Sequence, residues 1–478
     1  MKVLLVRSPS HHCIETEVPE AVRKENVSYP PLSLLAIATY LKEHSTHEVS
    51  ILDGLLHQYS YTEMEERIAA HAPDVVGITA FTVGLIDARK TVQAARSAGV
   101  KHVLLGGPHV NDFPRESGFF PDIDAAVCGE GQATLPPILE ALEEGKPLDD
   151  LPGVITMKKA QETASACIER PMLSDDLDTY PLLDLKLIEY QRYYDVLGKG
   201  ELFTTIITSR GCPYRCTFCN TPRDRYRTMS AGRICEEIEE KLRLGVREIY
   251  FVDDTFNITN GRVREMCEEI LRRGLKFRWT ARFRVKGVDR ALLTLMKRAG
   301  CNRLQFGVEQ ATDEALRLLQ KGVSIAEIEN AFRLCREVGI RTVAYFMLGT
   351  QVEKTREDLL RTIDFSIRLQ PDFVMYNIMT PFPGTTLFDE GLAQGVLKLE
   401  PWLDFIRNPS EDFVPQTWDQ YFKPDELGEY LHLAYRKFYF RPRFILQNLR
   451  ELNNIRDFMR KAKAGLTLLK PRELQARP

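Results

Sequence analysis

Residues 209–220 read Ser209-Arg210-Gly211-Cys212-Pro213-Tyr214-Arg215-Cys216-Thr217-Phe218-Cys219-Asn220. Gaps of three and then two residues separate the cysteines, so one tight loop can wrap three thiolates around an iron–sulfur cube and leave a fourth iron without a protein ligand. A metal centre with an open position binds a substrate or cofactor directly, whereas a closed one is structural. The stretch therefore predicts a catalytic cluster, and a structural zinc knuckle or a disulfide pair is the alternative.

The sequence around the cysteines resembles that of the radical S-adenosylmethionine superfamily. An apolar, strand-like run at 202–208 leads into the loop, and the aromatic Phe218 precedes the last cysteine. The resemblance implies a [4Fe-4S] cluster held by Cys212, Cys216 and Cys219, which are both metal ligands and the candidate catalytic residues. It also implies that S-adenosylmethionine binds the open iron.

Composition is that of a cytoplasmic enzyme with several domains. A chain of 478 residues exceeds one ordinary domain, and a hydrophobic content of 44% supplies buried cores. The ten cysteines lack the dense spacing of a secreted disulfide framework, which indicates a reducing compartment. The N-terminus is a short strand pattern interrupted by charge, so we expect neither a signal peptide nor a membrane span there.

The first 145 residues alternate between strand and helix patterns. Short apolar runs at 3–6, 49–52, 75–79, 103–105 and 125–128 are separated by segments of helical periodicity at 32–43, 63–71, 85–98 and 133–144. Alternation of this kind predicts a parallel sheet with helices on both faces. We therefore expect an α/β fold whose residues 1–145 form a Rossmann-like, doubly wound domain.

Small residues follow the strands of this domain, where doubly wound sheets bind their ligands. The loops are Thr79-Ala80-Phe81-Thr82, Gly106-Gly107-Pro108-His109 and Cys128-Gly129-Glu130-Gly131. Glycines allow a ligand to approach the backbone closely. From the residues alone this predicts a ligand-binding domain without naming the ligand, because glycine after a strand is often only a turn.

Three segments, Tyr29-Pro30-Pro31-Leu32-Ser33-Leu34-Leu35, Gly106-Gly107-Pro108-His109 and the run 124–131, together resemble the cobalamin-binding domain of cobalamin-dependent radical S-adenosylmethionine proteins. The resemblance implies cobalamin between this domain and the barrel. The residues it points to are Thr79, Gly106, Gly107, His109, Gly129, Glu130 and Gly131. An Asp-x-His-x-x-Gly motif is absent from the sequence, so the lower axial ligand of cobalt stays undetermined.

Residues 146–200 are rich in proline and polar residues and are predicted to form a linker or bridging segment. Strand-like runs then recur at 203–208, 248–252, 277–281, 303–307, 342–348 and 373–378, each followed by helical sequence. Six such units over residues 201–395 predict the partial TIM-type (β/α)6 barrel of the superfamily.

Polar groups at the carboxyl ends of barrel strands face the reaction chamber. Asp253, Asp254, Arg282, Arg284, Glu309 and Gln310 occupy such positions, and Tyr345, Tyr376 and Asn377 lie on strands that either face the chamber or pack in the core. The segments 251–256 and 306–309 resemble family motifs that approach the amino group and ribose of S-adenosylmethionine, which makes Asp253, Asp254 and Glu309 candidate cofactor contacts. Helix capping and rim ion pairs are the alternatives.

The resemblance implies a reaction with two cofactors. A 5′-deoxyadenosyl radical takes a hydrogen atom from an unactivated carbon, and methylcobalamin then supplies a methyl group, so we expect a C-methyltransferase of the EC 2.1.1 class acting on a small-molecule or lipid-like substrate. A reductant such as flavodoxin or ferredoxin is an expected partner. A cobalamin-dependent cyclase or rearrangement enzyme, a methylthiotransferase-like RNA enzyme and a non-enzymatic cobalamin or redox sensor are the alternatives, and a nucleic-acid partner is not expected.

Residues 396–478 are predicted to form a basic helical appendage in which aromatic and basic residues interleave. From Arg436 to Arg472 the basic residues far outnumber the two acidic ones, although the whole chain has a net charge of −3. Such a region suits a lipid-like or aromatic substrate and peripheral contact with an anionic membrane. Helix packing against the barrel explains the same residues.

Overall fold

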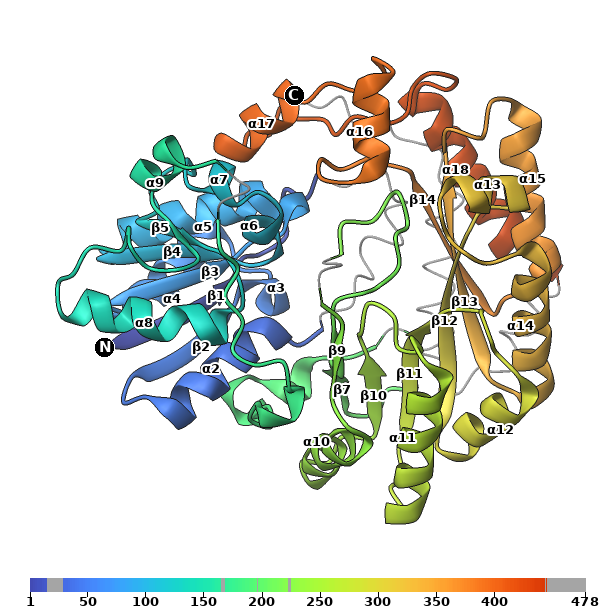
Figure 1. Cartoon of the computed structure of the whole chain (residues 1–478), viewed down its shortest axis with the longest axis horizontal. Helices are drawn as coiled ribbons and strands as arrows, with labels where there is room; N and C mark the ends of the chain where they lie inside the picture. Colours follow the sequence, from blue (N-terminus) through green and yellow to red (C-terminus); the bar gives the residue numbers. More distant parts are fainter. Residues whose placement is uncertain (15–28, 165–167, 196, 222–224, 443, 445–478) are drawn as a thin grey trace.

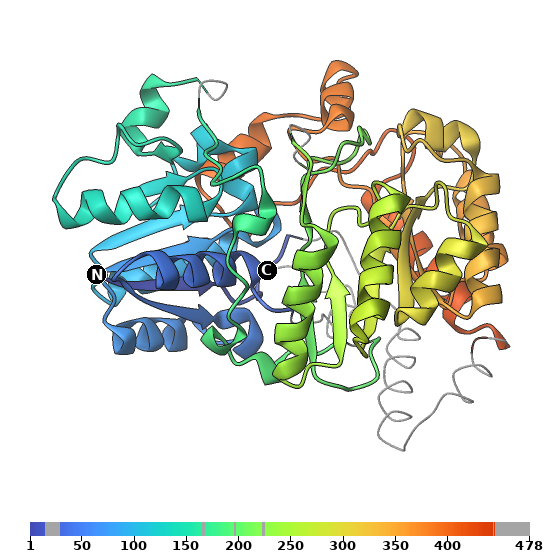
Figure 2. The same ribbon diagram turned by 60° about the horizontal axis from the view of Figure 1, so that its bottom comes forward.

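The computed structural model describes residues 1–14, 29–164, 168–195, 197–221, 225–442 and 444. Two six-stranded sheets with their helices lie side by side in Figure 1, the first in blue and cyan and the second in green to orange. Figure 2 shows the same arrangement after rotation, with the bridging segment between the two sheets. The expected α/β class is confirmed.

The first sheet has the strand order β2-β1-β3-β4-β5-β6. Its strands are β1 (Lys2–Arg7), β2 (Glu48–Asp53), β3 (Val75–Thr79), β4 (His102–Gly106), β5 (Ala125–Val127) and β6 (Val154–Ile155). Strands β1 to β5 pair in parallel, and β6 adds an antiparallel edge beside β5. The segment expected to be a linker thus contributes one strand to this sheet.

Helices cover both faces of the first sheet. They are α2 (Leu32–His44), α3 (Gly54–His57), α4 (Tyr61–His71), α5 (Leu85–Ser97), α6 (Pro108–Asp112), α7 (Pro114–Ser117), α8 (Gly131–Glu143) and α9 (Met157–Glu162). On β1, Val3 and Leu5 share a core with α2 and α8, whereas Leu4 and Val6 share one with α4 and α5. A strand buried on both sides requires this arrangement, so the doubly wound N-terminal domain is confirmed.

The second sheet is parallel throughout and has the order β14-β13-β12-β11-β10-β7. Its strands are β7 (Phe203–Ile206), β10 (Glu248–Phe251), β11 (Arg278–Phe283), β12 (Cys301–Glu309), β13 (Arg341–Leu348) and β14 (Phe373–Ile378). The helices between and after them are α10 (Ala231–Arg243), α11 (Asn260–Arg273), α12 (Arg290–Arg298), α13 (Asp313–Leu318), α14 (Ile325–Val338), α15 (Arg356–Leu369) and α16 (Thr386–Ala393). Six parallel strands with outer helices confirm the partial barrel.

The two faces of the second sheet differ in polarity. Phe251, Phe306 and Phe346 belong to the large core between the strands and the outer helices. On the opposite face, the Tyr250 and Tyr345 hydroxyls both donate to Gln305 Oε1, at 2.8 and 2.7 Å. An apolar outer face and a polar inner face suit a barrel that encloses a reaction chamber.

The chain beyond the barrel strands returns to both domains. Helix α17 (Glu400–Arg407) packs against α7 of the first domain, and α18 (Pro424–Tyr439) packs on β14 and α15. Trp402 on α17 and Tyr435 and Phe438 on α18 are buried, and so are Trp418 and Phe422 in the segment between the two helices. In the described residues, helix packing therefore accounts for most of the aromatic pattern.

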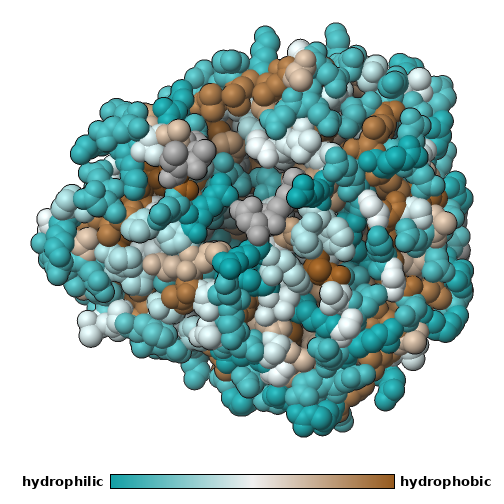
Figure 3. Space-filling view, viewed as in Figure 1, coloured by the Kyte–Doolittle hydropathy of each residue, from teal (hydrophilic) through white to brown (hydrophobic). Residues whose placement is uncertain are grey.

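The basic run from Arg436 to Arg472 lies largely outside the described residues, so its membrane contact stays a prediction. In the part of the chain that the structure describes, each helix is too short or too polar to span a lipid bilayer. The face of the molecule in Figure 3 is mostly hydrophilic, with hydrophobic side chains in scattered groups.

Candidate functional site

A cavity of about 340 Å³ lies at the carboxyl edge of the first sheet. Six of the residues predicted to bind cobalamin line it: Thr79, Gly106, Gly107, Gly129, Glu130 and Gly131. Apolar residues of β1, β3, β4, α2 and α8 form most of the rest of its wall on this side, including Leu5, Ile78, Leu104, Leu34 and Leu135. A mostly apolar cavity with a few polar groups is the usual form of a cofactor site.

Gly107 shows why glycine is needed at the edge of this cavity. Its φ of 102° is a conformation that side chains disfavour, and a Cβ there would lie 2.6 Å from Thr79 Oγ1 and 2.9 Å from Ala80 N. The turn after β4 can therefore lie close to the turn after β3. Without a side chain at 107, the backbone there lines the cavity directly.

His109 is placed differently from the other predicted residues. It is completely buried in α6 and does not line the cavity. Its Nδ1 lies 3.0 Å from Thr82 Oγ1, and burial lowers the pKa of its imidazole to about 3. A neutral histidine in this position connects two loops of the domain, so any effect on cobalamin would be indirect.

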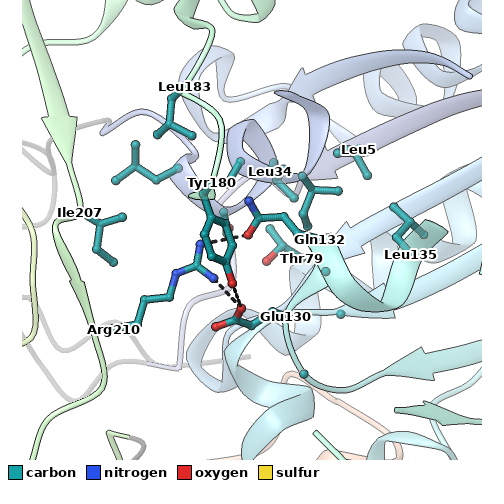
Figure 4. A pocket seen from close by; sticks show the side chains of 18 of the residues that line it. Leu5, Leu34, Thr79, Glu130, Gln132, Leu135, Tyr180, Leu183, Ile207 and Arg210 are labelled. Carbon is teal, nitrogen blue, oxygen red and sulfur yellow. Dashed lines mark hydrogen bonds and ion pairs between the residues drawn. The ribbon is translucent and has the colours of Figure 1, made fainter. Parts of the chain in front are cut away.

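The opposite wall of the cavity comes from the barrel and from the bridging segment. Ile206, Ile207, Arg210 and Met229 lie on or beside the first barrel strands, and Tyr180 belongs to the segment 146–200. The cavity is therefore formed between the two domains (Figure 4).

Glu130 joins these parts through its carboxylate. Arg210 Nη1 lies 2.8 Å from Glu130 Oε2, Tyr180 donates its hydroxyl to the same oxygen at 2.6 Å, and Arg227 pairs with the other oxygen. Arg210 also donates to Gln132 Oε1 at 2.9 Å, as Figure 4 shows. Burial by itself raises the pKa of Glu130, but Arg210 and the hydrogen bonds outweigh it and lower that pKa overall. Charge-assisted contacts of this kind fix a geometry.

The cysteine loop begins one residue after Arg210. Arg210 and Ser209 form β8 (Ser209–Arg210), which pairs antiparallel with β9 (Arg227–Thr228), and Gly211 turns the chain with a φ of 82°. Thr217, between the second and third cysteines, donates its N–H to Leu319 O at 3.1 Å and accepts from Leu387 N at 2.9 Å. The loop is thus anchored at its start and at its middle.

Within the described residues, Cys212, Cys216 and Cys219 form no disulfide bond, so the disulfide alternative does not hold there. Across the described residues, no three histidine, cysteine, aspartate or glutamate side chains converge as a single metal ion would require. A [4Fe-4S] cluster makes a different demand, because its thiolates bind separate irons. Three thiols spread along one anchored loop fit such a cluster.

Two cationic side chains lie against the loop. Arg284 is buried, stacks over the Tyr214 ring with 3.6 Å from Cζ to the ring centroid, and directs Nη1 toward Cys216 Sγ at 4.0 Å. Lys321 Nζ lies 5.7 Å from the centre of the Phe218 ring. Positive charge here attracts anionic ligands to the loop.

The two adjacent aspartates after β10 have different surroundings. Asp253 is completely buried and accepts from Thr208 N and Thr208 Oγ1, both at 3.0 Å, and from Ser209 Oγ. Asp254 is accessible, although burial within the barrel raises the pKa of its carboxyl and Arg282 opposes that rise. Asp253 therefore positions the strand that leads to the cysteines, and Asp254 is the carboxylate open to a ligand.

Glu309 lies at a bulge of β12, where the register with β13 shifts between Gly307 and Glu309. Its φ of 68° is rare for a residue other than glycine, and its carboxylate pairs with Lys321 at 2.6 Å. A Cβ on Gly307 would lie 2.3 Å from Glu309 Oε1 and 2.7 Å from Lys321 Nζ, so a larger residue at 307 would displace the ends of both side chains. Backbone strain of this kind gathers at functional sites.

Of the strand residues left open between chamber and core, Tyr345 lies on the inner face with Gln305, and Asn377 is exposed. Tyr376 faces outward, where its backbone N–H donates to the Tyr435 hydroxyl at 3.1 Å. The alternation of side chains along a strand could have assigned Tyr376 to the core. Its neighbour Asn377 is polar and suits the inner face, so Tyr376 must point to the opposite, outer face.

Sequence reasoning missed Lys321, Tyr180, Arg210 and Arg227. The first two lie in connecting segments, where no periodicity marks them. The two arginines flank the cysteine loop closely enough that a search for charged residues beside the motif would have found them.

Comparisons with known proteins agree with this geometry. The model of the radical SAM superfamily matches residues 206–365, and that of the B12 binding domain matches residues 22–139. An uncharacterized methyltransferase of Pyrococcus horikoshii is 30% identical over 461 residues, covering 94% of this chain and 95% of the relative. The chain belongs to the cobalamin-dependent radical S-adenosylmethionine family.

Two further relatives extend the comparison. The anaerobic magnesium-protoporphyrin IX monomethyl ester cyclase of Rubrivivax gelatinosus is 29% identical, covering 82% of this chain and 70% of the cyclase. The solved structure of OxsB with aqua-cobalamin and S-adenosylmethionine bound superposes with a TM-score of 0.72 at 17% identity, covering 98% of this chain and 71% of that one. At that identity the likeness supports the fold.

Membership of the family makes this protein a radical S-adenosylmethionine enzyme that uses a [4Fe-4S] cluster, S-adenosylmethionine and cobalamin, acts on a small molecule and needs a reductant. The three thiols fit the cluster, and the cavity between the domains fits part of cobalamin because it is mostly apolar, edged by glycines and bounded by the first barrel strands.

Proposed function

We propose that this enzyme transfers a methyl group to an unactivated carbon of a small-molecule or lipid-like substrate. The observation that carries the proposal is the position of the interdomain cavity, whose wall includes Arg210, two residues before the first cysteine of the cluster loop. A site for cobalamin and a site for radical generation therefore lie at one boundary. The methyltransferase of P. horikoshii, which matches along nearly its whole length, supports the same reaction class.

The bound cofactors would supply a hydrogen-abstracting radical and a methyl group. The protein's own residues hold the parts in place. Asp253 anchors the strand before the cysteines, Glu130 ties that strand to the cobalamin domain, and Arg284 places positive charge beside Cys216. The inner face of the barrel then orients the substrate and limits the access of water.

Anaerobic reconstitution of the full chain with iron, sulfide and cobalamin tests the proposal. The enzyme is incubated with a reductant such as reduced flavodoxin, S-adenosylmethionine labelled as CD3 and a pool of candidate metabolites, and products are followed by mass spectrometry. We expect a product that gains the labelled methyl group and is absent from the Cys216→Ala variant. A product that changes mass without the label would contradict methyl transfer.

Cyclisation is the second candidate, because the cyclase of R. gelatinosus is 29% identical over most of this chain. The same incubation separates the two reactions. Ring formation removes hydrogen from the substrate and leaves the label on the methionine that cleavage of S-adenosylmethionine releases.

A further inference from the structure

Arg282 lies near the carboxyl end of β11, in register with Gln305 of β12. Its side chain is exposed, whereas its neighbours Ala281 and Phe283 are buried in the core beneath the outer helices. Successive side chains of a strand point to opposite faces, and helices cover the outer face of this sheet. The guanidinium therefore opens to the space inside the barrel.

Hydrogen bonds fix one edge of this guanidinium. Arg282 Nε donates to the Tyr250 hydroxyl at 3.0 Å, and that hydroxyl donates to Gln305 Oε1 at 2.8 Å. Tyr345 donates its own hydroxyl to the same oxygen at 2.7 Å. Because a hydroxyl has one proton, this chain of bonds has one direction, and Tyr250 must accept from Arg282. The arginine is held through Nε, and neither of its Nη atoms forms a hydrogen bond with another described residue.

The charge of Arg282 is not neutralised by an ion pair with any described residue. Arg303, two residues before Gln305 on β12, provides the contrast, since it pairs with Asp195 and donates to Leu197 O at 2.7 Å. Asp254 acts on Arg282 through its charge, but the two form no ion pair within the part of the chain that the structure describes. Arg282 thus presents a fixed and unpaired cation to the chamber.

We propose that Arg282 binds an oxyanion of the substrate, a phosphate or a carboxylate, and so holds the substrate in the barrel. The two Nη atoms of a guanidinium form a planar pair of donors that matches two oxygens of such a group. A hydrocarbon in this place would remove the cation from water without a partner, which is costly. The proposal rests on the proposed function only in placing the substrate in this chamber, and it assigns an anionic group to the end that enters the barrel.

Anion binding can be measured without turnover. Inorganic phosphate is titrated into the anaerobic protein loaded with cluster, cobalamin and S-adenosylmethionine, and ³¹P line broadening reports saturable binding. A parallel titration with ¹³C-labelled acetate distinguishes a phosphate site from a carboxylate site. The variants are Arg282→Gln, Arg282→Lys, and Arg298→Gln as the control, because Arg298 is exposed at the end of α12 outside the barrel.

We expect saturable binding of at least one of the two anions, at least tenfold weaker binding in Arg282→Gln, an intermediate value in Arg282→Lys and no change in Arg298→Gln. Equal binding in Arg282→Gln and the parent protein would overturn the proposal, as would the absence of saturable binding of both anions. The electron paramagnetic resonance spectrum of the reduced cluster is recorded with and without S-adenosylmethionine. S-adenosylmethionine should change this spectrum in the parent protein and in all variants. If the change is lost only in Arg282→Gln, Arg282 binds S-adenosylmethionine rather than the substrate and the proposal fails.

The two proposals fail separately. Intact anion binding through Arg282 without transfer of the labelled methyl group would refute methyl transfer alone. Labelled product with unchanged anion binding in Arg282→Gln would refute the anion site alone.

Discussion

Replacement of Glu130 by glutamine should loosen the cysteine loop from the cobalamin domain. The side chain of Glu130 is 17% exposed and that of Arg227 is 7% exposed, so the ion pair is largely buried. Removing one partner of a buried pair costs roughly 3–5 kcal/mol. Glutamine retains an oxygen that can accept from Tyr180 or Arg210, and Arg210 keeps Gln132 as a second acceptor. We therefore expect Glu130→Gln to lower the free energy that holds the loop closed by about 2–3 kcal/mol.

Hydrogen exchange measures this loss where it occurs. The N–H groups of β8, β9 and Thr217 are protected by the pairing and contacts that hold the loop. When exchange follows local opening, 1.4 kcal/mol corresponds to about tenfold in rate, so the expected loss predicts roughly 30- to 150-fold faster exchange at 209–219. Peptides from the outer helices, such as α14, should exchange as before.

Glu236→Gln is the matched control. Glu236 is half exposed and pairs with Arg233 along α10 at 3.1 Å, an arrangement that contributes about 0.3–0.5 kcal/mol. Its replacement should leave exchange at 209–219 within twofold of the parent protein. If Glu130→Gln also stays within threefold, the carboxylate does not hold the loop and the reasoning is refuted.

The pH dependence gives a second check on Glu130. The pKa of Glu130 is lowered in the folded protein, so its ionised carboxylate stabilises the fold. This contribution to the free energy of unfolding is fully present above the ordinary glutamate pKa of 4.5 and is lost as the pH falls through the lowered pKa. The difference in stability between Glu130→Gln and the parent should therefore be constant between pH 6 and 8. A difference that grows toward pH 6 would point to another group.

Three further variants test other parts of the site. Gly307→Ala should weaken S-adenosylmethionine binding several-fold by isothermal titration, because the new Cβ displaces Glu309 from Lys321, and unchanged affinity would contradict a role for that pair. Asp112→Asn should raise the free energy of unfolding by about 1–2 kcal/mol at pH 8, measured by urea unfolding. Burial raises the pKa of Asp112 to about 6, so its ionisation opposes folding at higher pH. The gain should vanish below pH 4, and a loss of stability at pH 8 would refute this reasoning. Cys216→Ala should abolish the formation of 5′-deoxyadenosine measured by chromatography, and retained cleavage would remove the cluster assignment.

The sequence predicted the two domains because their signals are local and repeated. Short apolar strand runs, such as 103–105 before Gly106, alternate with helical runs in both domains, and the cysteine spacing marks the loop at the first barrel strand. The antiparallel strand β6 was missed because it has two residues and depends on pairing with β5. Such short edges are defined by tertiary contacts.

Side-chain roles were harder to predict than positions. Asp253 and Asp254 follow one strand and looked equivalent, yet one is buried under Thr208 and Ser209 and the other is accessible. His109 follows a glycine turn at the cavity edge but points into the core of its own domain. The direction in which a side chain points after a turn depends on the backbone conformation of each residue in that turn. A single sequence does not predict that conformation.

Three consecutive residues before the cysteine loop are held by carboxylates from both domains. Thr208 and Ser209 donate to Asp253 of the barrel, and Arg210 pairs with Glu130 of the cobalamin domain. A shift of the first domain would therefore pull on the residue that precedes Gly211 and the first thiolate. These contacts make the distance between the cluster loop and the interdomain cavity depend on how the two domains dock. That distance matters because a displacement of about 1 Å can lower a reaction rate a hundredfold. We infer that Glu130 and Asp253 act as a pair that sets this distance, and that losing Glu130 should affect the transfer step more than the cleavage of S-adenosylmethionine.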